Sequence, residues 1–300
     1  MRETQIVDFI LTLATADHRE KRLVKGIGDD SAILRPRSGE DLVFTTDFVL
    51  EGRHFDNESH KPPDIGHKAL ARSLSDLAAM GSEPVFCLVS LAVPDVRTDS
   101  WIRGFYRGLL ALANKYRIKL AGGDLARFEK IAVDVMCCGR VPTGGALLRS
   151  GAKPGDLIYV TGQLGSSAHG FASRRGSAWK RHLRPEPRVE AGVAIRRLGA
   201  SAAMDLSDGL SLDLLRLCRE SRVGAELSGE VPVARGATIE EALHGGEDYE
   251  LLFTASPRVR VPARVAELQV TKIGVITRGP AARVYLNGRQ LDPAGFDHFG

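Results

Sequence analysis

Long apolar runs and paired cysteines are both missing from this sequence of 300 residues. No stretch reaches the roughly 18 consecutive apolar residues that a membrane-spanning helix needs, and the N-terminal segment carries acids where an export signal is basic. The chain has only four cysteines, and none stands in the CxxC spacing of zinc and redox sites. We therefore predict a cytoplasmic protein without a membrane segment, whose cysteines are reduced core thiols.

Net charge is also small, because 41 Lys and Arg residues face 37 Asp and Glu residues and leave a formal charge of +4. So small an excess over this length argues against a nucleic-acid partner. The basic stretch 174–188 contains Trp179 as its one stacking aromatic, so a solvated loop is expected there. No GxxxxGK[ST] phosphate loop and no HRD or DFG kinase motif occurs, which excludes the common nucleotide-binding folds.

The remaining composition, 43% hydrophobic and 26% charged, is typical of a globular protein whose length favours two domains. Candidate strands alternate with helix-length periodic stretches, which predicts a mixed α/β (α+β) fold. We expect a strand over 41–46 that Asp47 ends, a leucine-striped helix over 62–80 capped by Gly81, and a short strand that stops at Ala121. Turn-forming residues over 142–145 and 151–156 mark a boundary, so we predict domains at 1–146 and 147–300.

Aspartates that stand beside Gly, Ser or Thr at expected element ends are the most informative feature of the chain. They occur in the segments 28–30, 45–47, 75–76, 122–124, 205–208 and 246–248. Dispersed carboxylates suit Mg²⁺, which prefers oxygen ligands and bridges them to substrate phosphates, better than they suit zinc. One such Asp alone is typical of a turn or cap, so for Asp47 and Asp76 a metal ligand and a structural residue are equal alternatives.

Whole strings of this sequence, in order and nearly end to end, resemble the thiamine-monophosphate kinase family. They are GIGDDSA from Gly26, TTDFVLEGRHF from Thr45, LSDLAAMG from Leu74, GGD from Gly122, RSGAKPGD from Arg149, DLSDGL from Asp205 and GGEDYEL from Gly245. The resemblance implies the two-domain fold of the aminoimidazole ribonucleotide synthetase superfamily. In that fold an N-terminal sheet domain binds ATP and metal and pairs in a homodimer, and an α/β domain follows.

The resemblance also implies site residues. Oxygen ligands for several Mg²⁺ ions would be Asp30, Thr45, Thr46, Asp47, Asp76, Asp124, Asp205 and Asp208. ATP would contact Gly123, Asp124, Arg149 and Ser207, and thiamine monophosphate would contact His54, Glu247 and Phe296. The family often has Tyr where this chain has Phe296, so ring stacking is kept while a phenol hydrogen bond is lost. For His54, a satisfied structural histidine is the alternative.

Phosphoryl transfer fits these residue types. Unit charges about 4 Å apart repel by roughly 4 kcal/mol at an effective dielectric constant of about 20, so two phosphate-bearing substrates need several metal ions between them. The acceptor phosphate, whose second pKa is about 6, is already a dianion near neutral pH. We therefore expect direct in-line transfer from ATP to thiamine monophosphate with no catalytic base, and with Arg149 neutralising charge.

Two alternatives stay open. Aminoimidazole ribonucleotide synthetase shares the implied fold and the use of ATP but acts on another acceptor, and a non-catalytic nucleotide or thiamine-phosphate binding protein would not need the full set of aspartates. Selenophosphate synthetase is disfavoured because the first cysteine, Cys87, falls inside an expected strand. The hydrogenase-maturation relative is disfavoured because the sequence ends in His-Phe-Gly and not in a cysteine.

Overall fold

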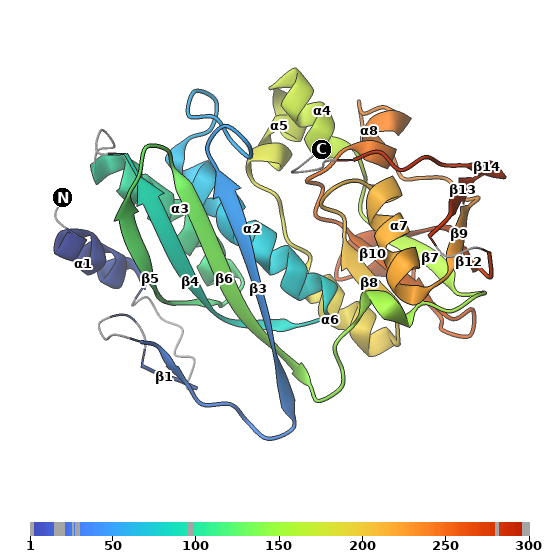
Figure 1. Cartoon of the computed structure of the whole chain (residues 1–300), viewed down its shortest axis with the longest axis horizontal. Coiled ribbons are helices and arrows are strands. Elements are labelled where there is room, and N and C mark those ends of the chain that lie inside the picture. The colour runs from blue at the N-terminus through green and yellow to red at the C-terminus, as the bar shows by residue number, and fades with distance from the viewer. Residues whose placement is uncertain are drawn as a thin grey trace. The chain divides into compact units, whose positions relative to one another are not determined.

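The computed structural model describes residues 3–14, 22–25, 27, 31–94, 99–279 and 282–295. The chain folds into two compact units. The N-terminal unit contains residues 1–77 and 83–144, and the C-terminal unit contains residues 78–82 and 145–300. Each unit combines helices with a β-sheet of its own (Figure 1).

The N-terminal unit is built on a four-stranded sheet with two long helices against one face (Figure 1). Its elements are α1 (Glu3–Ala14), β1 (Leu23–Lys25), β2 (Ile33–Leu34), β3 (Glu40–Leu50), α2 (Pro62–Ala79), β4 (Glu83–Val93), α3 (Asp99–Lys115), β5 (Lys119–Arg127) and β6 (Ala132–Pro142). The strand order is β3-β6-β4-β5, in which only β4 and β5 are parallel neighbours. The strand β3 therefore lies at one edge of the sheet.

Helices α2 and α3 approach each other closely at two glycines. A Cβ atom added at Gly66 would lie 2.0 Å from the carbonyl oxygen of Phe105, and one added at Gly108 would lie 1.9 Å from that of Pro63. Any side chain at these positions would force the two backbones apart. The glycines therefore fix how α2 lies against α3.

The leucine stripe expected over 62–80 is confirmed in α2. Leu70, Leu74 and Leu77 are fully buried in the core. The Ser73 hydroxyl of the same helix donates to the carbonyl oxygen of Val135 at 2.8 Å, which ties α2 to the middle of β6. The expected cap Gly81 has φ +66°, a conformation that favours glycine beyond a helix end.

The strand expected over 41–46 is longer than predicted. It pairs with β6 along its whole length, from Glu40 opposite Pro142 to Leu50 opposite Ala132. Asp47 therefore lies inside β3 and does not end it, contrary to the prediction. The reason is that the continuous ladder with β6 outweighs the local preference of Asp for strand ends.

The strand predicted to stop at Ala121 also continues. β5 runs on through the Gly-Gly-Asp string, which the sequence placed in a turn, to Arg127. Gly123 lies opposite Val89 in the parallel ladder, and a Cβ atom added there would lie 1.9 Å from the Val89 carbonyl oxygen. The glycine thus permits a close approach of β5 to β4 inside the sheet.

The C-terminal unit contains an eight-stranded sheet and most of the shorter helices. Its elements are η1 (Arg149–Gly151), β7 (Leu157–Thr161), α4 (Ser166–Ser173), α5 (Gly176–Leu183), α6 (Val189–Leu198), β8 (Ala202–Asp205), α7 (Leu210–Ser221), β9 (Gly224–Leu227), α8 (Ile239–His244), β10 (Leu251–Ala255), β11 (Arg264–Val265), β12 (Leu268–Thr277), β13 (Val284–Leu286) and β14 (Arg289–Gln290). The strand order is β14-β13-β9-β12-β7-β10-β8, with β11 paired to β12. Val160 of β7, Met204 of β8 and Leu252 of β10 pack with Leu214 and Leu217 of α7 in one core.

The basic stretch 174–188 contains a helix and buried side chains, so the prediction of a solvated loop was wrong. It contains α5, whose His182 is buried and stacks on Trp179 at 5.1 Å between ring centroids. Arg181 and Arg188 form ion pairs with Glu250. The charges of this stretch alone indicated solvation, because they show neither the distant partner Glu250 nor the stacking of His182 on Trp179.

All four cysteines are buried, and none of them forms a disulfide. Burial raises the pKa of the Cys138 thiol to about 11 and that of Cys218 to about 12, and it raises the pKa of Cys137 well above its ordinary value. None of the helices in the described part of the chain combines the length and the apolar character needed to cross a membrane.

Candidate active site

Three of the expected metal ligands come together on one face of the N-terminal sheet. Thr45 and Asp47 are two residues apart in β3 and therefore point to the same side of the sheet. Asp76 faces them from α2. The Thr45 hydroxyl donates to the Asp76 carboxylate. Arg72, one helical turn before Asp76, places its guanidinium 3.4 Å from Asp47. The cluster therefore combines carboxylate and hydroxyl oxygens with the guanidinium of Arg72, which contacts Asp47.

The negative charge of Asp47 is compensated only in part by its surroundings. Burial first, and then the neighbouring charge of Asp76, raises the pKa of Asp47 to about 6, although Arg72 acts in the opposite direction. The raised pKa means that burial and the charge of Asp76 outweigh the favourable contact with Arg72. A hard cation bound here would offset both effects, and the oxygen donor set fits the preference of Mg²⁺.

Thr46 and Asp124, two more of the expected ligands, lie on the opposite face of the sheet. Thr46 points away from Thr45 and Asp47, and its hydroxyl donates to Asp134 at 2.5 Å. Asp134 lies opposite Ser90 in the ladder of β6 with β4, and Ser90 lies opposite Asp124 on β5. The structure therefore divides the expected set between the two faces of the sheet. Within the described residues, no group of three or more His, Cys, Asp and Glu side chains is arranged to hold a metal, and Asp30 lies outside them.

Asp134 is a residue that the sequence reasoning did not single out. It stands in an apolar alternating run, where one polar residue is common on a half-exposed strand. Its partner Thr46 is 88 residues away in the sequence. The sequence offered only one signal, a carboxylate inside a strongly apolar strand, and that signal does not name a partner.

His54 lies in the turn that follows β3, and its side chain is buried. Its Nδ1 accepts the backbone N–H of Leu50 at 3.0 Å. Its carbonyl oxygen accepts a hydrogen bond from Nζ of the fully buried Lys68 at 3.2 Å. The turn that carries His54 is thus anchored from α2 by a buried ammonium group.

In the C-terminal unit, the end of β8 and the loop that follows it carry three expected residues, Asp205, Ser207 and Asp208. Asp205 is buried at the end of β8. The backbone N–H groups of Ser207 and Asp208 both donate to the carboxylate of Asp213 at 3.0 Å. Arg216 forms ion pairs with both Asp208 and Asp213. Burial raises the pKa of Asp213 to about 6, so this loop is organised around a carboxylate that its surroundings only partly compensate.

The GGEDYEL string lies against this loop. The N–H of Glu247 donates to the carbonyl oxygen of Ser207 at 2.8 Å, and the N–H of Tyr249 donates to that of Leu206 at 2.9 Å. Both Glu247 and Tyr249 have left-handed backbones, with φ +64° and +51°. The structure therefore brings Ser207, Asp208 and Glu247 into one neighbourhood next to the end of β8.

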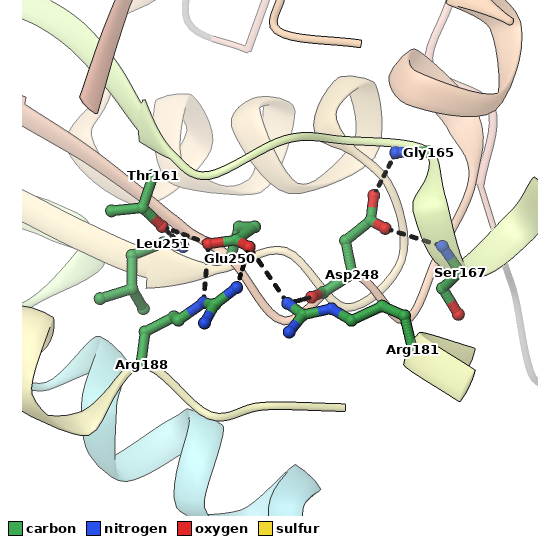
Figure 2. A network of polar contacts seen from close by, with 8 residues as sticks. All are labelled: Thr161, Gly165, Ser167, Arg181, Arg188, Asp248, Glu250 and Leu251. Carbon is green, nitrogen blue, oxygen red and sulfur yellow. Dashed lines mark hydrogen bonds and ion pairs between the residues drawn. The ribbon is translucent and has the colours of Figure 1, made fainter. Parts of the chain in front are cut away.

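Asp248 and Glu250 of the same string make internal contacts, as Figure 2 shows. The Asp248 carboxylate accepts the N–H groups of Gly165 and Ser167 at the start of α4. Glu250 lies between Arg181 and Arg188 and also accepts the hydroxyl of Thr161 at 2.7 Å. These two acids fix the string to the rest of the unit.

Arg149 and Phe296 are two further expected site residues. Arg149 is exposed in η1, and its carbonyl oxygen accepts the Ser221 hydroxyl at 2.6 Å. Phe296 lies outside the described residues.

Family models match both units of the chain. The AIR synthase related protein, N-terminal domain, matches residues 28–141, and the corresponding C-terminal domain matches residues 153–287. The thiamine-monophosphate kinase of Escherichia coli strain K12 is 39% identical over 301 residues, which cover 91% of this chain and 91% of the relative. The chain belongs to the thiamine-monophosphate kinase family.

Solved structures of thiamine-monophosphate kinases agree with this assignment. The crystal structure of the enzyme from Stenotrophomonas maltophilia K279a matches with a TM-score of 0.86 and 35% identity, and covers 97% of this chain and 98% of that one. A structure described as AaThiL complexed with AMPPCP and TMP matches with a TM-score of 0.80 and 31% identity, and covers 99% and 97%. These matches confirm the mixed α/β, two-domain fold expected from the sequence.

Proposed function

We propose that this chain transfers the γ-phosphoryl group of ATP to thiamine monophosphate and so forms ADP and thiamine diphosphate. The observation that carries the proposal is the cluster of Thr45, Asp47 and Asp76, whose oxygens face one another and whose Asp47 has a pKa raised to about 6. Such a cluster is suited to a divalent cation, and a cation is what two phosphate-bearing substrates require. Membership of the thiamine-monophosphate kinase family supports the choice of acceptor.

Mg²⁺ bound to these oxygens would reduce the charge on both phosphate groups and help to orient them. Thr45, Asp47 and Asp76 would be its ligands on one face of the N-terminal sheet. Their contribution is preorganisation, because Asp76 accepts the Thr45 hydroxyl, Arg72 lies against Asp47, and α2 is tied to β6. For the further Mg²⁺ ions of the reaction we propose Asp30, Thr46, Asp124, Asp205 and Asp208 as ligands.

The reaction needs no general base in this proposal. The acceptor is a phosphate dianion near neutral pH, since its second pKa is about 6, and its oxygen attacks directly in line with the leaving group. The chain then has to bind, orient and neutralise charge. For the nucleotide we propose contacts with Gly123, Asp124, Arg149 and Ser207, where the exposed guanidinium of Arg149 would neutralise phosphate charge. For thiamine monophosphate we propose His54, Glu247 and Phe296.

We also propose that the protein works as a homodimer in the cytoplasm. The edge strand β3 exposes two aromatic side chains on its outer face, Phe44 and Phe48, each 59% exposed. An edge strand with large exposed apolar groups is a pairing surface unless something covers it. A second copy of this sheet would bury both rings.

The test is a product assay on the purified chain with ATP and Mg²⁺. We expect thiamine diphosphate and ADP, separated by chromatography, to form from thiamine monophosphate and not from free thiamine, and to disappear when a chelator is added. Nucleotide binding without any product would contradict the proposal and favour another acceptor of the superfamily or a binding protein. Binding of ATP that is equally tight with and without Mg²⁺ would favour the binding protein.

The variant Asp47→Asn tests whether the cluster of Thr45, Asp47 and Asp76 acts in the reaction. It keeps the shape of the side chain but removes the charge, so we expect kcat to fall by about 100-fold or more. The melting temperature should hold, because a partly buried charge is removed. Asp41→Asn on the same strand is the matched control, since the Asp41 carboxylate accepts the N–H of Gly144 at 2.7 Å and lies six residues before Asp47. Normal turnover by Asp47→Asn would remove the basis of the proposal.

A further inference from the structure

The loop that carries Glu247 is held in an unusual backbone conformation. Glu247 and Tyr249 have φ +64° and +51°, in the left-handed region that residues other than glycine rarely adopt. Such conformations persist where the surroundings over-determine them, and they concentrate at functional sites. The contacts that hold this loop therefore bear on the function of Glu247.

The residues beside Glu247 are anchored from two helices (Figure 2). Asp248 binds the first turn of α4 through the N–H groups of Gly165 and Ser167, at 2.6 and 3.1 Å. Arg181 of α5 donates to the carbonyl oxygen of Asp248 at 2.9 Å. These buried or partly buried contacts hold the backbone at Asp248, and the Glu247 side chain is held by other groups.

The Glu247 carboxylate lies close to the ring of His182, the residue after Arg181 on α5. Its Oε2 lies 3.4 Å from Nδ1 of His182, and the Glu247 side chain is 22% exposed while that of His182 is only 6% exposed. A carboxylate accepts hydrogen bonds but does not donate them, so we assign the proton of His182 to Nδ1, where the Glu247 carboxylate and the Ser167 hydroxyl oxygen, 2.9 Å away, share it. Part of the Glu247 side chain thus reaches the surface.

His182 is itself fixed on several sides. The hydroxyl of Ser167 lies 2.9 Å from its Nδ1. Trp179 stacks on its ring at 5.1 Å with an interplanar angle of 11°, and Phe171 lies against it at 5.2 Å. A ring held by two aromatic side chains has one orientation, which makes it suitable for setting the direction of the carboxylate.

We propose that His182 is a positioning residue for Glu247, with its Nδ1–H holding the carboxylate toward the cationic thiazolium ring of the substrate. The inference rests on the proposed function, because it assigns Glu247 to thiamine monophosphate. The sequence placed His182 in a basic stretch and gave it no role of its own.

Two substitutions separate the donor from the ring. His182→Phe keeps an aromatic ring between Trp179 and Phe171 but removes Nδ1. His182→Asn loses the ring but keeps an N–H donor near the same position. His169→Phe is the matched control, because His169 of α4 makes the same kind of contact, 3.6 Å from Nδ1 to Oε2 of Glu241, away from Glu247.

Steady-state kinetics should divide these variants. We expect His182→Phe to raise the KM for thiamine monophosphate about tenfold, the loss of one hydrogen bond to a charged group, with KM for ATP unchanged. His182→Asn should restore much of this loss, and His169→Phe should behave as the wild type. A wild-type KM in His182→Phe, or an equal defect in His182→Asn, would overturn the proposal.

Hydrogen–deuterium exchange gives a readout that needs no substrate. The N–H of Glu247 is protected by the carbonyl oxygen of Ser207, so release of the side chain should speed exchange in the peptide that covers 245–250. We expect faster exchange in His182→Phe and none of this effect in His169→Phe. Unchanged exchange in a folded His182→Phe protein rejects the positioning role. If the wild type fails to phosphorylate thiamine monophosphate, the proposed function is lost, and the exchange result still decides whether His182 holds Glu247.

Discussion

Replacing Glu250 by Gln should destabilise the C-terminal unit strongly. Glu250 is 2% exposed and accepts hydrogen bonds from Arg181, Arg188 and the Thr161 hydroxyl. Gln has nearly the same shape but no charge, and its amide nitrogen would face donors where an oxygen stood. The substitution therefore leaves two largely buried guanidinium groups without their shared anion.

The expected cost follows from this arrangement. Breaking a buried ion pair by removing one partner costs about 3–5 kcal/mol, and because Gln keeps one oxygen acceptor we expect the lower end, about 3 kcal/mol. Domains are stable by about 5–15 kcal/mol, so this is a large fraction. In a unit of this size, 1 kcal/mol shifts the melting temperature by about 2–4 °C, which predicts a drop of about 6–12 °C.

Calorimetry of the full chain measures this effect. Glu240→Gln is the matched control, because Glu240 is 76% exposed and its partner His244 lies 3.4 Å away on the surface of α8. A surface pair of this kind contributes about 0–1 kcal/mol, so the control should melt within about 2 °C of the wild type. If Glu250→Gln shifts the transition no more than Glu240→Gln does, the buried network does not stabilise the unit and our reasoning is refuted.

Two further predictions concern pH and association. Burial raises the pKa of Asp248 to about 6, so the folded chain takes up a proton between about pH 7 and pH 5 that the unfolded chain, with a carboxyl pKa near 3.9, mostly does not. The wild type should therefore gain about 1 kcal/mol of stability relative to Asp248→Asn over that interval, and lose it as the pH rises through 6, in paired chemical denaturation curves. A difference that stays constant with pH would contradict the raised pKa. The double substitution of Phe44 and Phe48 by Ser should convert a dimer to a monomer in analytical ultracentrifugation, whereas Phe128→Ser, which removes a ring with 58% exposure beyond the end of β5, should not. A dimer that survives the double substitution would exclude this face as the interface.

The sequence predicted helices better than strand ends. The stripe of Leu70, Leu74 and Leu77 identified α2 because a helix shows its buried face at fixed spacings within one segment. The length of β3 depends on β6, which pairs with it from a segment far along the chain. No local pattern around Asp47 contains that pairing, so the predicted end at this residue was wrong.

For the candidate site, too, residue types were predicted from local sequence, whereas contacts between distant segments were not. Residue types and spacing pointed to carboxylates for a hard cation, and the structure brings Asp47 and Asp76 together with Thr45. Asp134 was missed because its contact with Thr46 joins segments 88 residues apart. Arg181 was likewise assigned to a solvated loop because Glu250, its partner, stands 69 residues later. Contacts of this kind arise from the fold and cannot be derived from one chain's local composition.

The burial of every native thiol gives the protein a practical advantage as a subject for spectroscopy. Cys138 and Cys218, with pKa values raised to about 11 and 12, hold almost no thiolate near neutral pH, and the thiolate is the form that reacts with maleimides. A cysteine introduced at an exposed position such as Glu240 would react first. A single fluorescent dye can therefore be attached to the folded chain without first removing any native cysteine.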